Sequence, residues 1–233
     1  MIRPIGLIGA MDEEIKLLLE QLQDMKSVTK AGTTYYTGLI SDKPVVVCKS
    51  GVGKVNAAVT SQILIDTFRV RCVLFTGVAG AVHEDLNIGD IVVSSECMQH
   101  DMDVTALGYP KGNIPYQEVS VFPADEKLIL LAEKATMSLR VRHLTGRVLS
   151  GDQFIASKAK VTELREEMDG VCAEMEGAAV AQACWMNGIP FVIIRSMSDR
   201  ADGSAPGNYE EFTVEAARRS HAILEFMLAH MQG

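Results

Sequence analysis

The sequence has little of what marks a secreted, disordered or repetitive chain. Its 233 residues include only seven prolines and one tryptophan, and they contain no low-complexity segment, internal repeat or obvious linker. The five cysteines form no C-x-x-C pair, and several lie in apolar runs, as is typical of buried thiols in a reducing compartment. The amino-terminal residues lack an apolar run followed by a small-residue cleavage site, so we expect no signal peptide and a cytoplasmic location.

Basic residues are also scarce relative to acidic ones. The chain has 22 lysines and arginines against 30 aspartates and glutamates, a formal net charge of −8. An acidic surface argues against a nucleic acid or an anionic membrane as partner. The longest uncharged stretch, residues 177–194, is interrupted by Gln182, Asn187 and Gly188-Ile189-Pro190. It therefore predicts a buried helix, a turn and a strand, and not a membrane span.

Apolar, β-branched runs alternate with helical patterns along the whole chain. The amphipathic helix expected from Met11 to about Met25, for example, has Ile15, Leu18, Leu19 and Leu22 on one face. Many strands are continuously apolar, which is typical of a sheet covered by helices on both faces. We expect one domain over residues 1–233, an α/β/α sandwich of three layers with a central mixed β-sheet. Strands are expected at 5–8, 35–40, 45–49, 72–76, 90–97, 144–149, 171–175 and 191–197, and helices at 11–25, 54–68, 125–136, 159–168 and 209–231.

Four of the expected strands end in polar or glycine-rich clusters. Ligands of α/β folds bind at the carboxyl ends of strands, so these clusters would line one cleft if their strands are neighbours. The clusters are Gly9-Ala10-Met11-Asp12-Glu13-Glu14, Thr76-Gly77-Val78-Ala79-Gly80, Glu174-Met175-Glu176-Gly177 and Arg195-Ser196-Met197-Ser198-Asp199.

The acids in these clusters have ordinary structural explanations as well as functional ones. Glu176 lies among small, apolar residues, where an acid is costly unless it is paired or functional, but Glu174 would serve equally well at a helix N-terminus. Asp199 fits a turn and the run 12–14 fits a first helical turn, so spacing alone assigns neither. Arg195, inside a strand, should pair with a carboxylate.

Two further motifs are weak. The loop 50–56 approximates G-x-G-x-x-G, but Asn56 takes the third glycine position and the spacing is not that of a P-loop. A tight turn that brings backbone near a ligand explains it better. The run His100-Asp101-Met102-Asp103 has no second cluster to complete a coordination shell, so we expect a loop or an interface there and no metal.

Together these segments resemble the bacterial 5′-methylthioadenosine/S-adenosylhomocysteine nucleosidase family. They occur in the family's order, span nearly the whole chain, and are highly specific as a set. The matching segments are Ile8 to Glu14, Ser50 to Val55, Thr76 to Gly80, His100 to Ala106, Ser150-Gly151-Asp152-Gln153-Phe154, Ala173 to Gly177 and Arg195 to Asp199.

The resemblance implies a nucleoside phosphorylase-like fold, a homodimer, no cofactor, and hydrolysis of the N-glycosidic bond of a 5′-substituted adenosine. Glu14 then corresponds to the base that activates water, and Asp199 to the acid that protonates adenine at N7. Two carboxylates in these roles suit an oxocarbenium-like transition state, as in other glycosidases. The remaining implied contacts are Glu176 and Met175 with the ribose, Phe154 and Ile155 with adenine, and Met11, Val52 and Tyr209 with the 5′ substituent. Val78, Arg195 and Ser198 complete the expected site, and Val104, Leu107 and Pro115 would come from the partner subunit.

The sequence departs from the family pattern near the sugar and the 5′ group. Val78 stands where many members carry serine, and Tyr209 and Leu107 each replace a common phenylalanine. Members with Gly-Val-Ala-Gly and Ser-Gly-Asp-Gln-Phe also accept 6-amino-6-deoxyfutalosine, so this substrate is an alternative.

Two other functions remain open at the level of sequence. A phosphate-dependent nucleoside phosphorylase would need cations near the acidic run 12–14, and only Lys54 and Arg195 offer them. A non-catalytic nucleotide sensor would use the loop 50–56, but Arg69-Val70-Arg71 lies where a dinucleotide-binding fold needs its ribose-binding acid.

Overall fold

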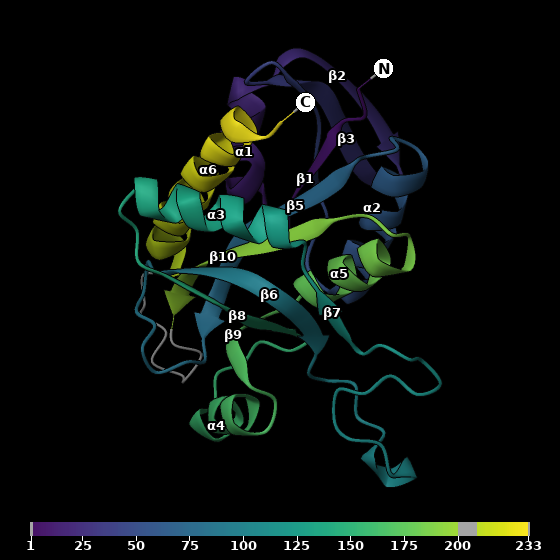
Figure 1. Ribbon diagram of the computed structural model, residues 1–233, viewed down its shortest axis with the longest axis vertical. Helices are drawn as coiled ribbons and strands as arrows, with labels where there is room; N and C mark the ends of the chain where they lie inside the picture. Colours follow the sequence, from purple (N-terminus) through teal and green to yellow (C-terminus); the bar gives the residue numbers. More distant parts are fainter. Residues whose placement is uncertain (1, 200–208, 233) are drawn as a thin grey trace.

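The computed structural model describes residues 2–199 and 209–232, without the side chains at positions 209–211 and 213. Helices are interspersed among the strands along the chain, and Figure 1 shows helices on both sides of the sheet. The strands are β1 (Ile5–Gly9), β2 (Gln23–Lys30), β3 (Thr33–Ile40), β4 (Lys43–Lys49), β5 (Cys72–Ala81), β6 (Ile91–Gln99), β7 (Val121–Pro123), β8 (His143–Ser150), β9 (Gly170–Glu174) and β10 (Phe191–Asp199). The helices are α1 (Asp12–Gln21), α2 (Lys54–Asp66), the 3-10 turn η1 (Thr105–Leu107), α3 (Glu126–Ser138), α4 (Lys158–Glu166), α5 (Gly177–Met186) and α6 (Tyr209–His230).

The core has two main layers of apolar side chains, one on each face of the sheet. Helices α2 and α5 bury Leu64, Ala181 and Cys184 against one face. Helices α1, α3 and α6 bury Leu18, Leu224 and their neighbours against the other. A smaller cluster includes Leu164 of α4, Leu149 of β8 and Met98 of β6. The arrangement is the three-layer α/β/α sandwich with a mixed sheet that the alternating pattern predicts.

Strand pairing closes part of the sheet on itself. Strands β5, β10, β6, β8 and β9 pair in a ring, because β5 bonds both to β9 and to β10. Strands β1, β4, β3 and β2 extend the sheet from β5. Parallel pairing aligns β1 with β5 and β5 with β10, so the carboxyl ends of these three strands meet at one edge.

The largest differences between the expected and the observed elements occur at three places. Helix α1 stops at Gln21 because Leu22 turns extended and Gln23 begins β2, so the helix expected to reach Met25 is shorter and a strand was missed. Strand β5 continues to Ala81, so the glycine cluster 76–80 lies inside the strand and not after it. The short strand β7 was also missed, because three residues carry too little periodicity to show.

Candidate active site

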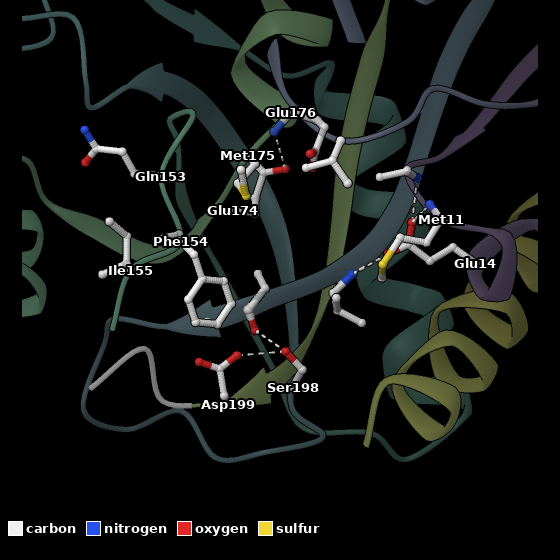
Figure 2. A pocket seen from close by; sticks show the side chains of 16 residues that line it. Met11, Glu14, Gln153, Phe154, Ile155, Glu174, Met175, Glu176, Ser198 and Asp199 are labelled. Atoms are coloured by element: carbon white, nitrogen blue, oxygen red, sulfur yellow. Dashed lines mark hydrogen bonds between the residues drawn. The ribbon is translucent and has the colours of Figure 1, made fainter. Parts of the chain in front are cut away.

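The four clusters at the strand ends do line one pocket. Strand β9 runs antiparallel to β5 with Gly80 opposite Ala173, which brings the Glu174 cluster to the same edge as the ends of β1, β5 and β10. Figure 2 shows the side chains that line the pocket. They are Ala10, Met11, Glu14, Val52, Val78, Ala79, Gly80, Gln153, Phe154, Ile155, Ala173, Glu174, Met175, Glu176, Ser198 and Asp199.

Glu14 lies in the first turn of α1 but does not face solvent, since its exposed fraction is 3%. Its carboxylate accepts backbone N–H bonds from Ala10 at 2.5 Å, Met11 at 3.0 Å and Val78 at 3.1 Å. Burial raises the pKa of Glu14, and the Arg195 charge and the three N–H groups oppose that rise. A buried carboxylate with a raised pKa is a stronger base than an exposed one, and this one points into the pocket.

Close approach of Glu14 and Arg195 depends on a glycine. A Cβ at Gly77 would lie 2.7 Å from Glu14 Oε1 and 2.9 Å from Arg195 Nη1. Both charged groups therefore converge on the same point above β5, where a larger residue would separate them.

Arg195 is 1% exposed and finds the carboxylate partner that its place in a strand predicts. Its Nη2 and Nε donate to Glu174 Oε2 at 2.5 and 3.2 Å, and its guanidinium lies 4.0 Å from the centre of the Phe75 ring. Glu174 also accepts the backbone N–H of Gly177 and the hydroxyl of Ser150. Glu174 thus combines a helix N-terminal role with a buried ion pair.

Glu176 lies apart from Glu174, because Glu174 is the last residue of β9 and Glu176 is the N-cap residue of α5. It is 6% exposed, and its Oε1 accepts the backbone N–H of Gly53 at 2.8 Å. Burial, followed by the negative charge of Glu174, raises the pKa of Glu176 to about 7, against the lowering effects of Arg195 and the Gly53 N–H. The carboxylate is held at the pocket wall, where it can accept bonds from a hydroxylated ligand.

Asp199 ends β10 and is 3% exposed. Ser198 donates its hydroxyl to Asp199 Oδ1 at 2.8 Å. In Figure 2, Phe154 and Asp199 lie toward one end of the pocket, and Glu14 lies with Met11 toward the other. Phe154 is 61% exposed and lies in the segment between β8 and α4, beside Ile155. An aromatic face next to a buried acid suits a flat heterocycle that accepts a proton.

The apolar part of the pocket contains the other predicted contacts. Met11, Val52, Val78 and Met175 all line it, and Val52 is 53% exposed at its rim. A thioether and branched aliphatic groups suit a soft, apolar substituent. The side chain of Tyr209 lies outside the described residues.

Val104, Leu107 and Pro115 are not brought to the pocket of their own chain, whose described lining lacks them. They belong to the segment after β6, which extends away from the sheet with η1 near its tip (Figure 1). Leu107 is 69% exposed there.

Sequence reasoning did not single out several groups that shape the site. The N–H groups of Gly53 and Val78 carry no side-chain signal, and the sequence did not indicate that Glu174 is the carboxylate that Arg195 binds. Gln153 adds an amide to the lining. Within the described part of the chain, no group of three or more His, Cys, Asp or Glu side chains is placed to hold a metal ion.

The comparisons with known proteins agree with this geometry. The phosphorylase superfamily model matches residues 4–229. A 5′-methylthioadenosine/S-adenosylhomocysteine nucleosidase of Staphylococcus carnosus is 40% identical over 225 residues, which are 96% of this chain and 98% of the relative.

Solved structures give the same result. The 5′-methylthioadenosine/S-adenosylhomocysteine nucleosidase of Neisseria meningitidis, in complex with methylthio-immucillin-A, superimposes with a TM-score of 0.94 at 37% identity, covering 99% of this chain and 100% of that one. A futalosine hydrolase of Helicobacter pylori has a TM-score of 0.94 at 35% identity and covers 99% of each chain. The resemblance inferred from the motifs is confirmed, and the chain belongs to the 5′-methylthioadenosine/S-adenosylhomocysteine nucleosidase family of the phosphorylase superfamily.

Proposed function

We propose that this protein hydrolyses the N-glycosidic bond of 5′-methylthioadenosine, S-adenosylhomocysteine and related 5′-substituted adenosines, and releases adenine. The observation that carries the proposal is one pocket that combines the buried bases and acids Glu14, Glu176 and Asp199 with the aromatic face of Phe154. Full-length similarity to nucleosidases supports it.

In the proposed reaction, Glu14 takes a proton from water while the water oxygen bonds to C1′ of the ribose. The bond from C1′ to adenine N9 breaks, and Asp199 supplies the proton that adenine gains at N7. Positioned acid–base groups of this kind typically contribute about a hundredfold to ten-thousandfold each. Arg195 forms an ion pair with Glu174 and lies beside Glu14 above Gly77. Its positive charge offsets the negative charge of these two carboxylates.

Substrate binding is assigned to the other lining residues. Phe154 stacks on the adenine ring, and backbone groups of Ile155 contact the edge of the base. Glu176 accepts the ribose hydroxyls and Met175 packs on the sugar. Met11 and Val52 contact the 5′ substituent, and Val78 and Ser198 complete the pocket wall. Tyr209 is assigned to the 5′ group by resemblance.

Water is favoured over phosphate as the nucleophile because of the charges at the pocket. Its described lining has four carboxylates and no lysine or arginine. Both cations that could have served phosphate are engaged elsewhere, since Lys54 binds Gln99 and Asp101 and Arg195 binds Glu174. A dianion in this pocket would be repelled.

A homodimer completes the proposed site, with Val104, Leu107 and Pro115 covering the 5′ group of the partner's ligand. Exposed apolar residues support it: Val55 and Val59, one turn apart on α2, are 74% and 43% exposed, and Leu107 is 69% exposed. Neighbouring exposed apolar side chains often mark a surface that a protein partner covers. Light scattering should give twice the mass of one chain, and Val55→Asp should shift it toward the monomer.

The proposed setting is the cytoplasm, which the five free, buried cysteines fit. The described helices include none long and apolar enough to cross a membrane.

The decisive experiment measures adenine release from methylthioadenosine by the purified protein with and without phosphate. We expect adenine and free methylthioribose in phosphate-free buffer. Glu14→Gln should abolish release, whereas Glu13→Gln, one residue away, is the matched control and should retain it. Release that needs phosphate and yields a sugar 1-phosphate would identify a phosphorylase, and tight binding with no turnover would identify a sensor.

The second candidate substrate is 6-amino-6-deoxyfutalosine. Similarity to a futalosine hydrolase at 35% identity favours it, as does the Gly77-Val78-Ala79-Gly80 sequence in the pocket wall. Direct competition between this nucleoside and methylthioadenosine, read as the ratio of kcat/KM values, would rank the two.

A further inference from the structure

An ion pair lies beside the pocket without lining it. Lys54, the first residue of α2, places its Nζ 2.6 Å from Asp101 Oδ1 and 2.8 Å from Gln99 Oε1. The side chains of Lys54 and Asp101 are only 17% and 14% exposed. Desolvation makes such a pair a weak source of stability. The presence of this ion pair beside the pocket therefore needs an explanation other than stability.

Asp101 uses its second oxygen to hold the segment that carries Phe154. Its Oδ2 accepts the backbone N–H of Asp152 at 2.9 Å, and Asp152 Oδ1 in turn accepts the backbone N–H of Lys54 at 2.8 Å. The segment from Gly151 to Ser157 has no helix or strand to position it. These two bonds therefore anchor it two residues before the ring of Phe154.

The same cluster also reaches Glu176. The N–H of Gly53 donates to Glu176 Oε1, and Gly53 has a φ of +96°, a conformation that favours glycine. A Cβ at Gly53 would lie 3.1 Å from Asp152 Oδ1, so the backbone at Gly53 sits between Asp152 and Glu176. The groups assigned to adenine and to ribose are thus tied to one set of contacts.

We propose that Lys54, Asp101 and Asp152 form a clamp that positions Phe154 and Glu176 for nucleoside binding, with Asp101 as its central positioning residue. The clamp rests on the proposed function for the identity of its ligand. Glu14 and Asp199 are held by α1 and β10, outside the clamp. Loss of the clamp should therefore weaken binding more than it slows the chemical step.

The test is Asp101→Asn in the full-length protein. Each Asp101 oxygen faces a donor, Lys54 Nζ or Asp152 N–H, so an amide nitrogen must oppose one of them. The matched control is Glu96→Gln, which alters a similar ion pair with Arg147, 2.6 Å long, away from the described pocket lining. KM and kcat for methylthioadenosine are measured, together with the Kd of adenine by calorimetry.

We expect Asp101→Asn to raise KM and the adenine Kd about tenfold or more, as loss of a charge-assisted hydrogen bond would, with kcat changed less than about threefold. Glu96→Gln should change none of them beyond about twofold. A folded Asp101→Asn protein with unchanged KM and adenine Kd, or with a reduced kcat alone, would overturn the clamp.

The pH profile supplies a readout that a purely structural role would not move. Glu176 faces Glu174, Arg195, Glu14 and the Gly53 N–H, and its pKa is lowered by Arg195 and, next, by the Gly53 N–H. Release of Gly53 by Asp101→Asn should move the acid limb of kcat/KM to higher pH. Glu96→Gln should leave that limb where it is, and an unmoved limb in Asp101→Asn would count against the clamp.

A misfolded variant and a failed proposed function can each be distinguished from a failure of the clamp. If Asp101→Asn does not fold, Lys54→Met removes the ammonium group and keeps the stem, with Arg147→Met as its matched control and the same expectations. If the wild-type protein releases no adenine, the proposed function fails. The comparison of adenine Kd values needs no turnover, so it still decides whether the clamp positions the base-binding segment.

Discussion

Replacement of Glu176 by glutamine should stabilise the empty protein at alkaline pH. Burial and the Glu174 charge raise the pKa of Glu176 from 4.5 to about 7. Because the folded-state pKa lies above the unfolded value, folding favours the protonated form. The stability penalty is absent below about pH 4.5 and complete above about pH 7. Glutamine has the same shape, can still accept the Gly53 N–H, and carries no charge.

The size of the effect follows from the shift. At about 1.4 kcal/mol per pH unit, the penalty that Glu176→Gln removes is about 3 kcal/mol at pH 8 and below about 1 kcal/mol at pH 5. For a chain of this length each kcal/mol moves Tm by roughly 2–4 °C, so the variant should melt roughly 6–12 °C higher at pH 8. Thermal unfolding without ligand, followed by circular dichroism from pH 5 to pH 8, measures it.

A control of opposite sign is available in Glu163→Gln. Hydrogen bonding and charge from Lys111 and Lys160 lower the pKa of Glu163. The Glu163 carboxylate therefore stabilises the fold above the usual glutamate pKa, and this stabilisation is lost as the pH falls. Its replacement should lower stability slightly at neutral pH. If Glu176→Gln is no more stable than the wild type at pH 8, or if its advantage does not grow between pH 5 and pH 8, the assigned pKa shift is wrong.

Three further substitutions test the site. Asp199→Asn should reduce kcat by about a hundredfold to ten-thousandfold while adenine binding, measured by calorimetry, is largely kept; normal turnover would remove Asp199 from the acid role. Phe154→Ala should raise KM and the adenine Kd by roughly tenfold or more, the usual contribution of base stacking, and unchanged values would show that the ring does not contact the base. Gly77→Ala would place a methyl group 2.7 Å from Glu14 Oε1 and should reduce kcat at least about a hundredfold in a protein with a normal circular dichroism spectrum, whereas retained activity would mean that Glu14 and Arg195 need not converge there.

Local sequence patterns accounted for most elements of the fold. Continuous apolar runs predicted β1, β4 and β10, and the helical period predicted α2 and α3 to within about two residues. The wrong predictions also came from local sequence patterns. The apolar pattern of α1 runs on into Leu22 and Met25, but the backbone turns extended at Leu22.

Function was readable because the clusters at the strand ends are specific as an ordered set. Each acid alone had a structural explanation, and their order along the chain identified the family before any contact was known. The positions of Glu14, Phe154, Glu176 and Asp199 around one pocket are then a fact of the structure, while their roles remain predictions.

The sequence by itself determined the α/β class, the family and the need of Arg195 for a carboxylate, because each depends on local periodicity, on motif order or on the cost of burying a charge. Tertiary structure decided which carboxylate Arg195 binds, the closure of β5 onto β10, and the contacts among Lys54, Asp101 and Asp152. These features join residues up to 119 positions apart, and several use backbone N–H groups that every residue except proline carries. Pairing at that distance is set by how the sheet folds back and by how the loops pack on it, and no local pattern in a single sequence encodes it.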